Sequence, residues 1–132
     1  MCIFCKIINK DIPAHVIYED ETVIAILDIS QVTLGHTLII PKKHVENFLD
    51  CPNDILNHVV SISQKIGREI MTKLNANGMN IISNVHEIAG QSVMHFHVHL
   101  VPRYDVHDGI SITFRSTENV DYKDVLKKIR ST

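Results

Sequence analysis

The stretch that decides the fold and the chemistry of this 132-residue chain is His95-Phe96-His97-Val98-His99-Leu100-Val101. Histidine alternates with an apolar residue three times, which is the two-residue period of a β-strand. We therefore expect the apolar side chains to face a core and the three histidines to share the opposite face. Imidazole binds metals and acts as a nucleophile or as a general acid or base near neutral pH. The run predicts a metal site or a catalytic site, with three unrelated surface histidines as the disfavoured alternative.

The length and composition of the chain predict one domain spanning residues 1–132. Hydrophobic residues make up 45% of the sequence, which is enough for a single sizeable core. A net charge of −2 gives no reason to expect a nucleic acid or an anionic membrane as partner. The sequence has no apolar run of the ~20 residues that a membrane span needs, and its N-terminus lacks a signal-peptide pattern. Three cysteines do not make a disulfide framework, so we expect a cytoplasmic protein.

Hydrophobic periodicity predicts the elements of an α+β domain. A long helix is expected over residues 53–74, where apolar residues recur at steps of three and four. A short helix or turn is expected over residues 4–8, and a short helix over residues 122–129 near the C-terminus. Strands are predicted over residues 16–19, 23–28, 35–41, 80–84 and 93–102. Together these elements indicate a five-stranded antiparallel sheet with one long helix and a short C-terminal helix.

Cys2 and Cys5 form a Cys-x-x-Cys pair, which is half of a zinc site. Redox-active thiols and coincidence are the alternatives, although a thioredoxin-like motif lies between a strand and a helix rather than at residue 2. Cys51 stands apart and precedes Pro52 at the start of a helix. The second half of a zinc site would therefore be histidine.

Several ordered blocks of the sequence resemble the histidine triad family of nucleotide hydrolases and transferases. Besides the triad itself, they are residues 3–8, Asp28-Ile29, Gly35-His36, residues 40–44, Asn84 and residues 90–93. The resemblance covers nearly the whole chain and is greatest to the Hint branch, the adenosine 5′-monophosphoramidases. It implies a HIT-like fold, a homodimer, and purine nucleoside monophosphate derivatives, such as those of AMP, as ligands.

The resemblance implies catalytic roles for four side chains. His97 matches the nucleophile, which would attack the α-phosphorus of a nucleotide and form a nucleotidyl-imidazole that water then hydrolyses. His36 matches a residue beside the nucleophile and is given a supporting role, with a satisfied histidine at a strand end as the alternative. His99 and Ser92 match residues that contact the α-phosphate and the leaving group, where hydrogen-bond donors lower the barrier.

The resemblance also implies a nucleotide site. Asp28 matches the carboxylate that accepts hydrogen bonds from the ribose 2′- and 3′-hydroxyls. The walls of the base pocket would be four apolar residues that otherwise read as ordinary core: Phe4, Ile7, Ile26 and Ile29. Asn84 and Gln91 would add neutral donors near the phosphate, with a position on the loop surface equally open for Gln91. The site is completed by three residues already named, Ser92, His97 and His99.

In many bacterial members of the family, zinc lies on two such cysteines, on the histidine after a Pro-Lys-Lys block and on the first triad histidine. The resemblance therefore implies a structural zinc on Cys2, Cys5, His44 and His95. Two thiolates and two neutral imidazoles make a closed tetrahedral site without an open position for catalysis.

Three functions stay open at this point. The favoured one is a hydrolase of nucleoside 5′-phosphoramidates or adenylates. The second is a Fhit-like hydrolase of dinucleoside polyphosphates, against which the lack of basic residues for a longer leaving group counts. The third is a purine-nucleotide-binding protein with slow turnover, whose partner interactions matter more than its catalysis. The segment after Pro102 departs from the Hint pattern, and in the family this end shapes the leaving-group side and the dimer.

Overall fold

The computed structural model describes residues 2–131 and contains a five-stranded antiparallel sheet. In sequence order the strands are β1 (Val16–Glu19), β2 (Val23–Leu27), β3 (Thr37–Pro41), β4 (Gly78–Ile82) and β5 (Val98–Arg103). Their order in the sheet is β1-β2-β3-β5-β4, so β1 and β4 are the edges. The helices are α1 (Ile3–Ile8), α2 (Asn53–Lys73) and α3 (Tyr122–Arg130), with 3-10 turns η1 (Phe48–Asp50) and η2 (Glu87–Ala89). The predicted α+β fold is confirmed.

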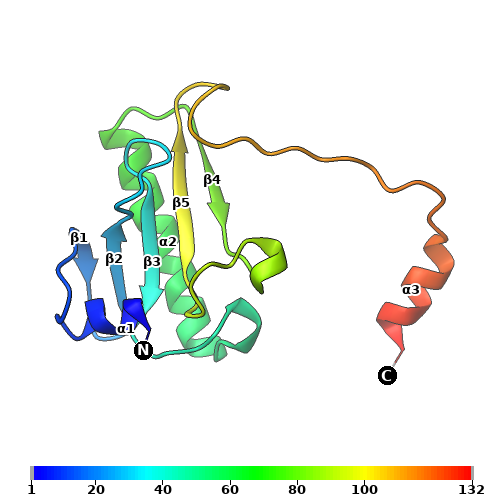
Figure 1. Ribbon diagram of the computed structural model, residues 1–132, viewed down its shortest axis with the longest axis horizontal. Helices are drawn as coiled ribbons and strands as arrows, with labels where there is room; N and C mark the ends of the chain where they lie inside the picture. The colour runs from blue at the N-terminus through cyan, green and yellow to red at the C-terminus, as the bar shows by residue number, and fades with distance from the viewer. Residues whose placement is uncertain (1, 132) are drawn as a thin grey trace.

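The two faces of the sheet belong to two separate hydrophobic clusters. The long helix α2 covers one face (Figure 1) and contributes a buried stripe at steps of three and four: Val59, Ile62, Ile66 and Ile70. The short helix α1 lies against the other face, where Phe4 and Ile7 pack on side chains of β2 and β3. The strands β2 and β3 therefore alternate between two apolar environments, which explains their continuous runs of apolar residues.

The strand that carries the triad begins later than the sequence predicts. We expected it from residue 93, but β5 starts at Val98, so only His99 of the three histidines lies on it. The alternation of faces is nonetheless as predicted for the apolar residues. Phe96, Val98 and Leu100 are buried in the cluster under α2.

The late start has a physical reason in the neighbouring strand. The pairing of β3 with β5 ends at Ile39 opposite Val98, and continuing it would bring Pro41 opposite Phe96. Proline has no N–H to donate, so the ladder cannot continue there. The N–H of Phe96 instead donates to the carbonyl of Val45. The segment before β5 is thereby released from the sheet and can turn its histidines toward α1.

The remaining elements agree with the sequence apart from small shifts. The long helix ends one residue early, the third strand starts two residues late, and β4 lies two residues before its predicted range. After Ile110 the chain leaves the sheet in an extended segment that ends in α3, at a distance from the rest of the molecule (Figure 1). Among residues 2–131, the structure has no helix that is both long enough and apolar enough to cross a membrane.

Candidate functional site

A cavity of about 360 Å³ lies on the α1 side of the sheet. Its apolar walls come mainly from α1, β2 and β3 and include Ile3, Phe4, Ile7, Ile26 and Leu38. Its polar lining consists of Asp28, Ser30, Ser92, His97 and His99. No lysine or arginine is found among the residues that line it. The cavity thus combines an apolar slot with two imidazoles, two hydroxyls and one carboxylate.

Most of the residues predicted to hold a nucleotide meet in this cavity. They are Phe4, Ile7, Ile26, Asp28, Ile29, Ser92, His97 and His99. Ile29 is 89% exposed, so it lies at the rim rather than in a closed wall. Asn84 and Gln91 are not part of the lining. The Asn84 amide donates to the Gly90 carbonyl, and the buried Gln91 amide donates to the carbonyls of Glu46 and Val93.

The ring of His97 is held in one orientation and one tautomer. Its Nδ1–H donates to the carbonyl of His95, 2.7 Å away, which leaves Nε2 without a hydrogen. The edge-to-face contact with Phe4, at 4.9 Å between ring centroids, fixes the ring from the side of α1. Burial lowers the pKa of His97 below its ordinary 6.5, so the ring is neutral at pH 7. A neutral imidazole with a bare Nε2 at a cavity is a competent nucleophile.

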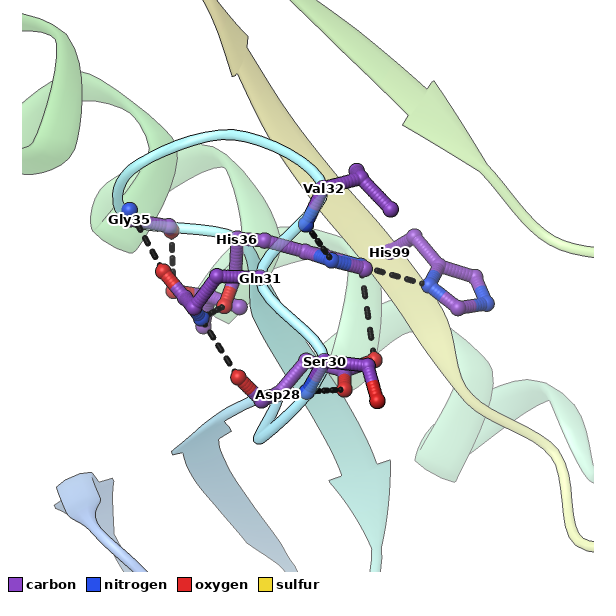
Figure 2. Close-up of polar contacts among 8 residues, drawn as sticks. Asp28, Ser30, Gln31, Val32, Gly35, His36 and His99 are labelled. Carbon is purple, nitrogen blue, oxygen red and sulfur yellow. Dashed lines mark hydrogen bonds and ion pairs between the residues drawn. The ribbon is translucent and has the colours of Figure 1, made fainter. Parts of the chain in front are cut away.

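A chain of hydrogen bonds sets the tautomer of His99 (Figure 2). The backbone N–H of Val32 donates to Nδ1 of His36 over 3.5 Å, so this nitrogen is an acceptor. Nε2–H of His36 then donates to Nδ1 of His99 at 2.9 Å. The remaining hydrogen of His99 must therefore be on Nε2, the nitrogen of a ring that lines the cavity.

The electrostatic surroundings keep His99 neutral. Burial, followed by the neighbouring rings of His97 and His36, lowers the pKa of His99 to about 4. A neutral His99 is a hydrogen-bond donor through Nε2 and cannot serve as a cation at pH 7. His36 was predicted beside the nucleophile, but the structure places it against His99 instead. The ring of His99 in turn lies 4.9 Å from that of His97.

Asp28, His36 and His99 also lie close enough together to be considered as a metal site. The hydrogen-bond directions argue against it, because a metal on His36 Nε2 would require the hydrogen on Nδ1. That hydrogen would point at the N–H of Val32, and two donors would face each other. The cluster is better described as a carboxylate beside two rings that are joined by a hydrogen bond.

Gln31 organises the loop that carries this cluster, and sequence reasoning missed it. Its amide donates to the carbonyls of Asp28 and His36, and its Oε1 accepts from the N–H of Gly35 (Figure 2). Gly35 has a φ of +92°, a conformation that favours glycine. The glycine was a visible turn signal, but the contacts of Gln31 depend on the exact course of the loop and have no sequence signature.

The four residues predicted to hold zinc come together on the N-terminal side of the triad. The Nδ1 atoms of His44 and His95 are 3.1 Å apart. The sulfur of Cys5 lies 3.5 Å from His44 Nδ1 and 3.6 Å from His95 Nδ1. The sulfur of Cys2 lies 3.3 Å from His95 Nδ1. Tetrahedral zinc with ordinary Zn–N and Zn–S lengths needs separations of roughly 3.3 to 3.8 Å between ligand atoms. Three of these separations fall in that range and the His44–His95 separation is slightly shorter, so small shifts of the side chains would fit the set to this metal.

The other ring nitrogen of His95 supports the same conclusion. Nε2–H of His95 donates to the carbonyl of Pro41 at 2.7 Å, which leaves Nδ1 free of hydrogen and turned toward the two cysteines. Metal-bound histidines are commonly oriented in this way by a carbonyl partner. His95 is fully buried, and burial lowers its pKa, so its neutral ligand form persists at pH 7.

Comparison with known proteins places the chain in a family. A family model described as the HIT domain matches residues 9–106. The chain belongs to the HIT family. An uncharacterized HIT-like protein of Methanocaldococcus jannaschii is 48% identical over 98% of this chain and 99% of its own length. The crystal structure of a HIT family protein from Bacillus anthracis is 45% identical, covers 97% of this chain and 91% of its own, and superposes with a TM-score of 0.90.

Two further solved structures are those of a zinc-bound relative and of a nucleotide-binding relative. A Zn-bound histidine triad family protein from Mycobacterium smegmatis is 40% identical over 89% of this chain and 84% of its own, with a TM-score of 0.76. A histidine triad nucleotide-binding protein from Candida albicans is 31% identical over 98% of this chain and 92% of its own, with a TM-score of 0.85.

We predict that the ring of His99 stays neutral, with its hydrogen on Nε2, throughout the range from pH 8 to pH 5. This follows from its pKa of about 4 and from the donation by His36. Imidazole ¹⁵N chemical shifts across a pH titration distinguish the two tautomers and the charged form, and a His99→Gln variant assigns the signal. In His36→Ala the partner of Nδ1 is lost, and the ring should sample both tautomers. A charged His99 ring at pH 6 in the wild-type protein would contradict this assignment.

Proposed function

We propose that this protein is a nucleotide-binding hydrolase of the Hint type, which cleaves nucleoside 5′-phosphoramidates or adenylates through a nucleotidyl-His97 intermediate. The observation that carries the proposal is the bare Nε2 of His97 beside the donor nitrogen of His99, at one cavity. The Candida albicans relative, described as nucleotide-binding, supports the ligand class.

The proposed reaction gives roles to three polar groups of the cavity, those of His97, His99 and Ser92. Nε2 of His97 attacks the α-phosphorus, a P–N bond to the histidine forms, and the bond to the leaving amine or carboxylate breaks. Nε2–H of His99 and the hydroxyl of Ser92 donate to the phosphate oxygens and the leaving group, where negative charge develops. Water then hydrolyses the phosphoramidate bond and regenerates the free histidine.

The rest of the cavity is suited to holding a nucleoside. Asp28 has one oxygen on the N–H of Ser30, and its side chain is 20% exposed, so the carboxylate can accept from ribose hydroxyls. The apolar slot between α1 and the sheet would take the base by burial and stacking, with few polar groups to discriminate among bases. Base preference is therefore expected to be broad.

The charge of the cavity favours a small leaving group. A polyphosphate chain carries several negative charges, and catalysts of its cleavage place cations against them. The lining residues of this cavity include no lysine or arginine, and Asp28 adds a negative charge. We therefore place cleavage of dinucleoside polyphosphates second.

The central prediction is that His97→Ala abolishes turnover of an adenosine phosphoramidate by several orders of magnitude, because the variant lacks the nucleophile. Ser92→Ala and His36→Ala remove a donor or a support and should retain measurable activity, at roughly a hundredth to a thousandth of wild type. Acid quench followed by mass spectrometry should find one AMP on a peptide containing His97. Burial lowers the pKa of His97, so activity should stay level from pH 8 to below 6.5 and fall only at lower pH, as the nucleophile takes up a proton.

The same measurements decide among the alternatives. Faster turnover of a diadenosine polyphosphate than of the phosphoramidate would favour the second function. Tight AMP binding with no turnover above that of His97→Ala would favour a nucleotide-binding protein. A label on a residue other than His97 would refute the mechanism.

We also propose a structural zinc on Cys2, Cys5, His44 and His95, supported by their separations and by the Zn-bound relative from Mycobacterium smegmatis. When bound, the metal supplies a cross-link between the start of α1 and the segment before β5, and all four of its positions are filled by protein.

We predict about one zinc per chain in protein purified without an affinity tag, measured by elemental analysis. The double variant Cys2→Ser/Cys5→Ser should lose the metal and melt at a lower temperature, because zinc binding is coupled to folding. Cys51→Ser is the control, since Cys51 lies in the core under α2 and belongs to no such cluster. Full zinc content in the double variant would show that the site is wrongly assigned.

We propose, finally, that the protein is a homodimer. The edge strand β4 is open, and beside it lies a mainly apolar groove of about 400 Å³ lined by Phe48, Val60, Ile81, Val85 and Val98, among others. Val60 and Ile81 are 52% and 65% exposed, so α2 and β4 present apolar surface that the sheet of one chain does not cover. Light scattering at micromolar concentration should give twice the 15.0 kDa chain mass, and a monomeric mass would refute the proposal.

A further inference from the structure

The side chain of Gln31 ties together the backbone of two residues whose side chains meet at the candidate site. Its Nε2 donates to the carbonyl of Asp28 at 2.6 Å and to the carbonyl of His36 at 2.7 Å (Figure 2). The side chains of those two residues face each other, with Oδ2 of Asp28 3.6 Å from Nε2 of His36. The backbone N–H of Asp28 adds one further bond to the His36 carbonyl, and among residues 2–131 no other side chain donates to the backbone of both. The Gln31 amide therefore helps to fix how the two ends of the loop 29–35 approach each other.

The second half of this loop is held by groups other than Gln31. Among the residues that the structure describes, the one backbone–backbone hydrogen bond of the loop runs from the N–H of His36 to the carbonyl of Thr33. Side chains outside the loop donate to the carbonyls of residues 34 and 35. The backbone of Gly109 packs against the carbonyl of Val32. These contacts all act on the chain after the N–H of Val32.

The first half of the loop depends on Gln31. Apart from the two donated bonds, Oε1 of Gln31 accepts from the N–H of Gly35 at 2.8 Å, so the side chain spans the loop. The N–H of Ser30 donates to the Asp28 carboxylate at 2.8 Å, which orients that side chain. The peptide group that joins Gln31 to Val32 carries the N–H of Val32. Its position therefore follows the position of Gln31.

The rings of His36 and His99 can share their hydrogen bond in two ways while both are neutral. In the first, Nε2–H of His36 donates to Nδ1 of His99, and the hydrogen of His99 is on Nε2. In the second, Nδ1–H of His99 donates to Nε2 of His36, and Nε2 of His99 carries no hydrogen. The same separation of 2.9 Å between the two nitrogens serves both arrangements. Only the first arrangement gives the cavity a donor on the His99 ring.

Two groups that Gln31 positions select the first arrangement. The N–H of Val32 lies 3.5 Å from Nδ1 of His36, where in the second arrangement it would meet another N–H. The Asp28 carboxylate attracts the hydrogen that the first arrangement places on Nε2 of His36. Both separations are longer than those of ordinary hydrogen bonds, so a small displacement of the loop would remove the preference.

We propose that Gln31 is a positioning residue, which holds Asp28 and the N–H of Val32 and thereby keeps the hydrogen of His99 on Nε2. The effect on the reaction rests on the proposed function, whereas the position of the hydrogen is a property of the free protein. His97 provides an internal reference, because the carbonyl of His95, and not the loop, sets its tautomer.

Imidazole ¹⁵N chemical shifts of the free protein test the position of the hydrogen. In Gln31→Ala the shifts of His99 should move toward those of a mixture of the two tautomers, while the shifts of His97 stay at the wild-type values. Leu34→Ala is the matched control, because this apolar side chain of the same loop is 68% exposed, and both rings should keep their wild-type shifts. An unchanged His99 tautomer in Gln31→Ala would overturn the proposal. So would an equal change at His97, which would indicate general damage to the site.

Gln31→Glu separates the donated bonds from the size of the side chain. The glutamate keeps the length of the side chain and an oxygen for the N–H of Gly35, but at pH 8 it has no hydrogen for the carbonyls of Asp28 and His36. It should therefore shift the His99 signals at least as far as Gln31→Ala does. A wild-type tautomer in Gln31→Glu would show that the donated bonds do not hold the loop and would refute the proposed role.

Steady-state kinetics with an adenosine phosphoramidate test the consequence for turnover. Gln31→Ala should lower kcat about two- to tenfold, less than His36→Ala does, because the donor nitrogen remains and only the fraction of rings that present it falls. The dissociation constant of AMP should change by less than about threefold, since Asp28 keeps its bond from the N–H of Ser30.

The two readouts keep the role of Gln31 distinct from the proposed function. An unchanged kcat in a variant whose His99 tautomer has shifted would overturn the role of Gln31 in the reaction. If the wild-type protein itself does not turn over the phosphoramidate, the proposed function fails, and the ¹⁵N shifts still decide whether Gln31 sets the tautomer.

Discussion

The ring and the backbone carbonyl of His95 connect the candidate metal site with the ring of His97. Nε2–H of His95 is bound to the carbonyl of Pro41, which turns Nδ1 toward the two cysteines and His44. The backbone carbonyl of the same residue accepts Nδ1–H of His97 and so leaves Nε2 of His97 without a hydrogen. A displacement of His95 would therefore disturb the ligand cluster and the tautomer of His97 together. This double role would allow the proposed zinc to lie only two residues from the proposed nucleophile.

The two imidazole rings that line the cavity, those of His97 and His99, are neutral at pH 7. Burial keeps His97 unprotonated, and it keeps His99 a donor without charge, with a pKa of about 4. Two neighbouring imidazolium ions would repel each other and would leave no nucleophile, so the lowering of both pKa values by burial suits the proposed chemistry. As a consequence, the three histidines of the triad supply no positive charge at pH 7. The proposed substrate, which presents a single phosphate, suits a site of this kind.

The sequence predicted the elements and the faces because these depend on local periodicity. The alternation through Phe96, Val98 and Leu100 is visible in the sequence and is confirmed in the core. The start of β5 was wrong by five residues, because it depends on which residue of another strand lies opposite, and that residue is Pro41. Most residues of the cavity were anticipated through the family resemblance. The contact of His36 with His99 and the contacts of Gln31 were not, because they depend on the course of an irregular loop.

Residues 111–131 illustrate a different limit of sequence reasoning. The periodicity of residues 122–129 predicts a helix with one apolar face, and the helix is present. The sequence cannot tell whether that face covers its own chain or another one, since both satisfy the same pattern. In the structure the contacts of Gly109 and Arg103 direct residues 111–131 away from their own core. Gly109 also touches Val32, whose N–H is the first donor in the chain of hydrogen bonds that ends at His99.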